Sequence, residues 1–171
     1  HTMQAELARE VGIGVLGSLI VREADGTRFN TCLLLDATGT LLYTYRKIHI
    51  PHEPGFWESS HYEADTSPPR PVEAFGISMG IQICSDVNRP TGSYLLAAQG
   101  AQCILAPRST ELATWWKWRP VLIANALTSC AYVLTVNRPA PEDGVLIGGP
   151  SFAVAPTGEV LAESTDPVVV V

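Results

Sequence analysis

Apolar positions along the first part of the chain switch between helical and extended spacing. Residues 4–10 place apolar groups at helical spacing, and the run VGIGVLGSLIV (11–21) predicts a largely buried strand. The apolar runs at 28–36 and 41–47 flank an Asp-Ala-Thr-Gly segment that favours a tight turn, so they predict an antiparallel hairpin. This hairpin places Lys47 at a strand end. Residues 48–71 show no periodicity and predict a long ordered loop.

The rest of the chain predicts strands that alternate with helices. VEAFGIS (72–78) and MGIQICSD (79–86) predict two short strands, the second of which ends at Cys84. The following elements are a helix that begins at Pro90 and is capped by Gly100, a strand at 101–107, a helix at 115–129, a strand at 131–139 and a hairpin at 149–164. Such alternation with inserted hairpins predicts one domain of layered α/β fold over residues 1–171.

Composition narrows the classes of function. With 46% hydrophobic and 16% charged residues, the chain is long and apolar enough to bury one sizeable core. The net charge of -6 and the scattered basic residues exclude a footprint for nucleic acid or an anionic membrane. No apolar run approaches the roughly 20 residues of a membrane-spanning helix. The first residues lack the order of a secretion signal, which favours a cytoplasmic protein.

The cysteines and histidines predict neither a metal site nor a cofactor. The four cysteines form no C-x-x-C pair, and Cys32, Cys103 and Cys130 lie in apolar stretches typical of buried structural cysteines. The histidines of the 48–71 loop lack the spacing of a helical ligand pair.

Cys84 differs from the other cysteines because it is predicted where a buried strand stops and a helix begins. At such a turn the sulfur can reach the edge of the sheet, and a helix N-terminus stabilises negative charge on it. The same turn aims the backbone N–H groups of Ser85 and Asp86 at charge developing on a carbonyl oxygen. Cys84 is therefore a candidate nucleophile beside an oxyanion hole, while position alone leaves open a buried cysteine that merely ends a strand.

Three separate parts of the chain resemble the nitrilase superfamily of carbon-nitrogen hydrolases. YRKIHIP (45–51), then Glu58, then ICSD (83–86) match that family in order and spacing, as do later segments at 100–101, 107, 137–138, 149–151 and 156–158. The resemblance implies an α/β fold, a four-layer α-β-β-α sandwich that is incomplete in this chain. It also implies a homodimer or higher homo-oligomer.

The same resemblance implies roles for individual residues. Cys84 would attack an amide-type carbon and form a thioester that water hydrolyses. Lys47 would stabilise the oxyanion together with the Ser85 N–H group, and Glu58 would orient Lys47. Residues 45–58 look closer to those of carbamoyl-amide amidohydrolases than to those of nitrile-cleaving members. A linear amide or N-carbamoyl compound is thus the expected substrate, with a nitrilase, an omega-amidase or an acyl transferase as alternatives.

The chain departs from the family pattern at the general base. The family's base glutamate follows a buried strand, in a Phe-Pro-Glu setting upstream of the lysine, and residues 1–171 contain no counterpart. We therefore expect the family's N-terminal strand-helix-strand to be missing from this chain. Glu6 and Glu10 lie in a predicted helix and do not take the role. A catalytically inactive member or fragment that serves as an interaction module is the hypothesis from another class.

Two arginines are candidates for binding a substrate carboxylate. Arg89 follows the Cys84 turn, where the family usually has an aromatic residue, and Arg108 follows the next strand. A guanidinium can grip a carboxylate with two parallel hydrogen bonds. Each arginine is more often a surface or salt-bridge residue. The tryptophans at 115–118 are more often core residues than pocket residues.

Overall fold

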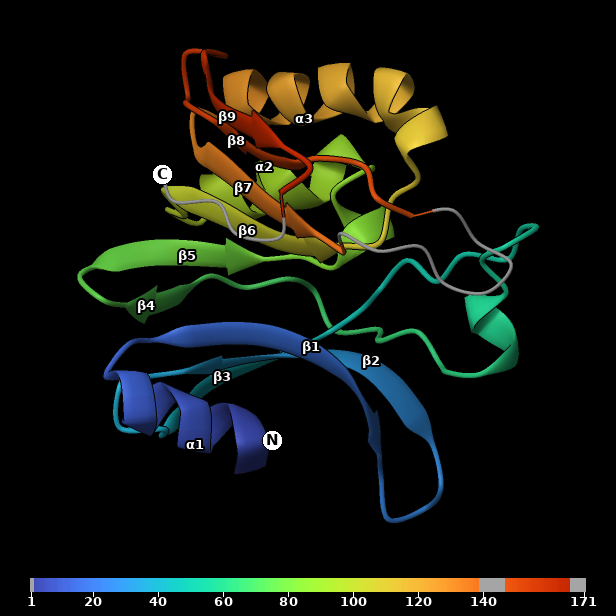
Figure 1. The fold of residues 1–171 in the computed structure, drawn as a ribbon, viewed down its shortest axis with the longest axis vertical. Coiled ribbons are helices and arrows are strands. Elements are labelled where there is room, and N and C mark those ends of the chain that lie inside the picture. Colours follow the sequence, from blue (N-terminus) through green and yellow to red (C-terminus); the bar gives the residue numbers. More distant parts are fainter. Residues whose placement is uncertain (1, 139–146, 167–171) are drawn as a thin grey trace. The chain divides into compact units, whose positions relative to one another are not determined.

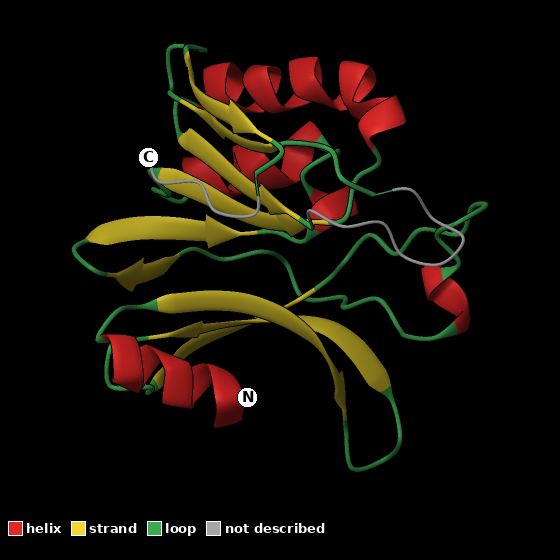
Figure 2. Ribbon diagram, in the orientation of Figure 1, coloured by secondary structure: helices red, strands yellow, loops and turns green. Residues whose placement is uncertain are grey.

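The computed structural model describes residues 2–138 and 147–166 (Figure 1). The chain divides into two compact units, residues 1–67 and residues 68–171. Each unit combines helix and sheet, as the colouring by secondary structure shows (Figure 2). The prediction of one partial domain over residues 1–171 stays a prediction.

The first unit is a helix packed on a three-stranded antiparallel sheet. Its elements are α1 (Thr2–Val11), β1 (Val15–Arg22), β2 (Arg28–Leu35) and β3 (Leu41–Arg46), with strand order β1-β2-β3. α1 buries Ala5 and Ala8 and packs on β1 and β2. The strand predicted at 11–21 is corrected in two ways. It begins only at Val15, because Gly12 in a left-handed conformation ends α1, and its residues are half-buried or exposed in alternation rather than largely buried.

The predicted hairpin between β2 and β3 is confirmed, and Asp36 explains why the chain turns there. Its carboxylate accepts hydrogen bonds from the backbone N–H groups of Thr38 and Thr40, and Gly39 takes a φ of 76°. A hydrogen bond from the Thr38 side chain, with further ones from the backbone, lowers the pKa of Asp36. After β3 the chain runs as a loop that contains the short 3-10 helix η1 (Glu58–Ser60), and the predicted loop is thus confirmed.

The second unit is a six-stranded mixed sheet with two helices packed on it. The strand order is β4-β5-β6-β7-β8-β9, and β5, β6 and β7 are parallel. The helices α2 and α3 pack against each other and lie over the sheet (Figure 1). The elements are β4 (Val72–Ala74), β5 (Ile77–Ile81), η2 (Cys84–Asp86), α2 (Pro90–Ala98), β6 (Cys103–Arg108), η3 (Leu112–Thr114), α3 (Trp115–Ser129), β7 (Tyr132–Asn137), β8 (Ser151–Val154) and β9 (Val160–Ser164).

The boundaries predicted for the first two strands of this unit are wrong. Phe75 and Gly76 both have positive φ values, 53° and 80°, and form a two-residue hairpin turn between β4 and β5. β5 therefore ends at Ile81, three residues before Cys84. The two helices are found where they were predicted, and the strand predicted at 131–139 is found at 132–137, with Pro139 outside the described residues.

The core of the second unit lies between the sheet and the two helices. Leu96, Ile104, Leu122 and Val133 are fully buried there. Trp115 joins this core, packing edge-on against Phe152 with ring centroids 5.0 Å apart, as expected for a core tryptophan. Trp116 does not, because it is 77% exposed. Among the described residues, no helix is both long and apolar enough to cross a membrane.

Candidate active site

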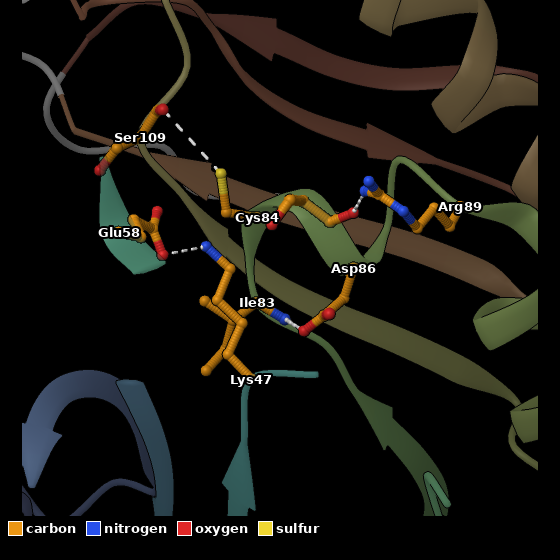
Figure 3. A network of polar contacts seen from close by, with 8 residues as sticks. Lys47, Glu58, Ile83, Cys84, Asp86, Arg89 and Ser109 are labelled. Atoms are coloured by element: carbon orange, nitrogen blue, oxygen red, sulfur yellow. Dashed lines mark hydrogen bonds and ion pairs between the residues drawn. The ribbon is translucent and has the colours of Figure 1, made fainter. Parts of the chain in front are cut away.

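The first unit holds a buried ion pair made by Lys47 and Glu58. Lys47 directly follows β3, where its N–H donates to the Asn30 carbonyl at 2.8 Å and its own carbonyl accepts from the Asp65 N–H at 2.9 Å. These two bonds fix the backbone on both sides of the side chain. The Lys47 Nζ lies 2.6 Å from the Glu58 Oε2, and the two side chains are 0% and 15% exposed (Figure 3).

Burial makes this ion pair different from an ordinary surface salt bridge. Removing an ammonium from water costs several kcal/mol, and a close carboxylate offsets that cost only while the pair is intact. Glu58 begins η1, so the 3-10 turn presents its carboxylate to the lysine. The Glu58 carboxylate therefore holds the Lys47 ammonium in a fixed position.

The second unit presents Cys84 on a strained turn. Cys84 opens η2 with a φ of 47°, a left-handed conformation that costs a non-glycine residue on the order of 1–3 kcal/mol. The Asp86 carboxylate holds the turn by accepting the Ile83 N–H at 3.1 Å, and Asn125 tethers it by donating to the Val87 carbonyl at 2.6 Å. A strained strand-to-helix turn of this kind displays a nucleophile at the end of a sheet.

Two details of this turn correct the expectations drawn from the sequence. The helix α2 begins only at Pro90, so η2 separates Cys84 from its N-terminus, and the helix dipole acts mainly within the first turn. The Asp86 N–H donates to the Ile83 carbonyl at 3.0 Å. The Asp86 N–H group is therefore engaged inside the turn, which argues against its predicted role as an oxyanion donor, and the role of the Ser85 N–H group stays a prediction.

The sulfur of Cys84 has a contact that the sequence did not predict. Its Sγ lies 3.9 Å from the Ser109 carbonyl oxygen, within reach of a thiol hydrogen bond (Figure 3). Ser109 directly follows β6, the strand parallel to β5. The next residue, Thr110, is fixed by Asn137 at the end of β7, whose side chain accepts its N–H at 2.7 Å and donates to its carbonyl at 3.0 Å. The sequence could have suggested that Ser109 and Cys84 lie close together, because each follows one of two adjacent parallel strands.

The two candidate arginines have different surroundings. Arg89 is exposed, and its Nη1 donates to the Ser85 carbonyl at 2.8 Å (Figure 3). Arg108 is buried, and its Nε donates to the Thr110 Oγ1 at 3.0 Å. Burial lowers the pKa of the Arg108 guanidinium, and electrostatic interaction with Cys84 opposes that shift.

The predicted site residues thus form two groups, one in each unit. Lys47 and Glu58 belong to residues 1–67, whereas Cys84, Ser85 and both arginines belong to residues 68–171. Among residues 2–138 and 147–166, no group of three or more histidine, cysteine or acidic side chains is arranged to hold a metal ion. The second unit thus carries the candidate nucleophile, the Cys84 sulfur, and the first unit carries an ammonium held by a carboxylate.

Residues 3–167 match the family model described as carbon-nitrogen hydrolase. The chain is 28% identical over 176 residues to an N-carbamoylputrescine amidase from Arabidopsis thaliana, an alignment that covers 94% of this chain and 58% of that protein. It is 32% identical over 171 residues to the omega-amidase NIT2 from Homo sapiens, with 94% and 60% covered. The chain therefore spans about three fifths of the length of these relatives.

Solved structures agree with the sequence comparison. An amidase from Nesterenkonia sp. AN1, in a Glu-to-Gln mutant that carries the product of Michael addition of acrylamide at its active-site cysteine, matches with a TM-score of 0.88 and 27% identity. The match covers 95% of this chain and 63% of that one. A mutant of the same amidase has been solved in complex with butyramide and also gives a TM-score of 0.88, at 26% identity over 95% of this chain and 61% of that one. The predicted fold class is confirmed by these likenesses.

Proposed function

We propose, because the chain belongs to the carbon-nitrogen hydrolase family, that Cys84, Lys47 and Glu58 act together to hydrolyse the C–N bond of a linear amide or N-carbamoyl compound. The observation that carries the proposal is the strained turn at Cys84, which presents a sulfur nucleophile. The buried Lys47–Glu58 pair and the amidases among the relatives support it. Since the chain spans only part of those relatives, the activity is proposed for the complete gene product.

In the first half of this reaction, the Cys84 sulfur attacks the amide carbon, and the carbonyl oxygen becomes negatively charged. The Lys47 ammonium and the Ser85 N–H group stabilise that charge, which exists only in the tetrahedral intermediate and in the transition states beside it. The C–N bond then breaks, and the nitrogen leaves as ammonia or an amine after taking up the proton that the Cys84 thiol lost on attack, which Lys47 can relay by giving its own proton to the nitrogen and taking up that of the thiol. The product bound to the enzyme is a thioester.

In the second half, water attacks the thioester carbon, the C–S bond breaks, and the Cys84 thiol is restored as the acid departs. Glu58 lies 2.6 Å from the Lys47 Nζ and holds it in place, so that the lysine does not have to reorganise as charge develops on the substrate. A lysine suits this role because its ammonium is a compact point charge that can also give up a proton.

Hydrolysis is tested by measuring ammonia release from N-carbamoyl amines, N-carbamoyl amino acids, amides and nitriles with the complete gene product. Cys84→Ala and Lys47→Ala are each expected to lower kcat by at least about a thousandfold, because each removes a group that acts on the transition state. Matched controls are Cys130→Ala and Lys117→Ala, which change an exposed cysteine and an exposed lysine. These two variants should retain turnover.

A chemical probe identifies the nucleophile independently of the substrate. Because the related Nesterenkonia amidase carries an acrylamide adduct at its active-site cysteine, we expect acrylamide to modify Cys84 in preference to the exposed Cys130, as read by peptide mass spectrometry. Absence of turnover across the panel, together with no preference for Cys84, would contradict the hydrolase. That result would instead support an interaction module without catalytic activity.

The proposal includes a small-molecule substrate, a cytoplasmic location and a homodimer or higher homo-oligomer. Exposed apolar residues on η3 and α3, Leu112 at 58% and Trp116 at 77%, support the oligomer because large exposed hydrophobic side chains are common at subunit interfaces. Light scattering coupled to size-exclusion chromatography measures the assembly. A monomer at micromolar concentration would contradict this part of the proposal and leave the chemistry untouched.

A further inference from the structure

Arg108 is a buried cation with most of its hydrogen-bonding capacity unused. Its side chain stands at the end of β6, the residue is 4% exposed, and its Nε donates a hydrogen bond to the Thr110 Oγ1. Its Nη1 and Nη2 are both buried and have no hydrogen-bond partner among the residues that the structure describes. A buried charged group left unpaired costs several kcal/mol, so this arrangement calls for a reason.

The place of Arg108 beside the nucleophile supplies that reason. Its guanidinium interacts electrostatically with Cys84, and the residue after it, Ser109, carries the carbonyl that lies 3.9 Å from the Cys84 sulfur. Both groups belong to the second unit, so their proximity is a property of one compact body. The Nη1 and Nη2 groups of the guanidinium can donate two parallel hydrogen bonds to the two oxygens of a carboxylate.

We propose that Arg108 binds a carboxylate of the substrate while Cys84 attacks its amide or carbamoyl carbon. This inference rests on the proposed hydrolase function and names its substrate class, which is amides and N-carbamoyl compounds that also carry a carboxylate. Monoamides of dicarboxylic acids and N-carbamoyl amino acids belong to this class. N-carbamoyl amines with a free ammonium are excluded from it, because a second cation next to a buried guanidinium is repelled.

Two alkylating reagents test the proposal without any need for turnover. Iodoacetate and iodoacetamide present the same reactive carbon, at which a sulfur–carbon bond forms, the carbon–iodine bond breaks and iodide leaves, but only iodoacetate carries a carboxylate. We expect the ratio of the iodoacetate rate to the iodoacetamide rate to be about tenfold higher at Cys84 than at the exposed Cys130, as one charge-assisted hydrogen bond would give. Peptide mass spectrometry of the full chain measures both sites in the same sample.

Variants separate carboxylate binding from an effect on the sulfur. Arg108→Gln is expected to bring the ratio at Cys84 down to that at Cys130. Arg108→Lys keeps the charge but loses the pair of parallel N–H donors, so it should retain part of the difference between the two ratios. Arg89→Gln is expected to leave the ratio unchanged, because the Nη1 of Arg89 already serves the Ser85 carbonyl. If Arg108→Gln slows both reagents equally, Arg108 acts on the reactivity of the sulfur, and the proposal is overturned. It is also overturned if Arg89→Gln, and not Arg108→Gln, removes the preference of Cys84 for iodoacetate.

Stability and kinetics complete the test. Arg108→Met removes an unpaired buried charge at similar volume, so its melting temperature should equal or exceed that of the unaltered chain, whereas a purely structural arginine would show a loss. With the complete gene product, Arg108→Gln should raise KM about tenfold for carboxylate-bearing amides and leave KM for neutral amides unchanged. If the iodoacetate-to-iodoacetamide ratio is raised at Cys84 as expected but no amide is hydrolysed, only the proposed hydrolase function is contradicted. Hydrolysis of neutral amides with no preference for carboxylates contradicts only the role of Arg108.

Discussion

Removal of Glu58 is predicted to destabilise the fold much more than removal of Lys47. Glu58→Gln leaves a fully buried ammonium without its negative partner, a situation that typically costs about 3–5 kcal/mol. We expect about 3 kcal/mol, because the glutamine oxygen keeps one hydrogen bond to the lysine. Lys47→Met removes the buried charge itself and leaves a carboxylate that is 15% exposed and can be hydrated. Its cost should stay within about 1 kcal/mol.

The magnitude follows from the geometry of the pair. Two unit charges 2.6 Å apart attract each other by about 6 kcal/mol at an effective dielectric constant of about 20. The desolvation of the two ions cancels most of that attraction. The double variant Lys47→Met/Glu58→Gln should therefore be close in stability to Lys47→Met, and the double-mutant cycle should give a coupling free energy of about 3 kcal/mol in magnitude.

Urea unfolding of the chain at constant pH measures these differences, with equal m-values as the check that only the free energy of unfolding has changed. Lys117→Met, which alters an exposed lysine, is the control and should change stability by less than about 0.5 kcal/mol. A Lys47→Met variant that is as unstable as Glu58→Gln would refute the reasoning, since Lys47 would then be a structural anchor. If the Lys47→Met protein is stable but inactive, Lys47 is required for the reaction and not for the stability of the fold.

Three further predictions concern the second unit. Gly80→Ala should lower the free energy of unfolding by about 1–3 kcal/mol in urea titrations, because a Cβ there would lie 2.8 Å from the Leu96 Cδ1. Burial alone would raise the pKa of Glu163, but hydrogen bonds from two side chains lower it overall. The unaltered chain should therefore be more stable than Glu163→Gln above about pH 4.5, and this difference should vanish as the pH falls further. Thermal unfolding at a series of pH values measures it. Burial raises the pKa of Cys103 to about 11, so a disulfide reagent at pH 8 should modify Cys130 in the folded chain and leave Cys103 intact, as mass spectrometry can show.

Local signals in the sequence predicted those elements whose causes are local. The turn at Asp36–Gly39 depends on an aspartate that caps its own neighbours and on a glycine with positive φ, and both can be read from the residues. The strand boundaries predicted at 72–86 were wrong because the turn at Phe75 and Gly76 lies inside a nearly continuous apolar run, which does not show where one strand ends and the next begins. A phenylalanine in a left-handed conformation, as at Phe75, is not a usual turn signal.

In the candidate site, too, the features with local causes could be predicted and those that depend on distant residues could not. The position of Cys84 followed from its motif, whereas its distance from α2 depends on a 3-10 turn that apolar patterning does not register. Lys47 and Glu58 are eleven residues apart across a loop without periodicity, so only the family resemblance linked them. The burial of Arg108 could not be predicted, because an arginine at a strand end is usually exposed and its surroundings depend on long-range strand pairing.

The burial of Lys47 also determines how the protein responds to amine chemistry. The chain contains two lysines, and the other, Lys117, lies exposed on α3 with its ammonium 4.8 Å from the centre of the Trp118 ring. A succinimidyl ester therefore encounters one accessible lysine side chain and one that is withheld from it. Dyes, cross-linkers and sensor surfaces coupled through lysine will attach at α3, and acylation there will remove a cation from beside an indole.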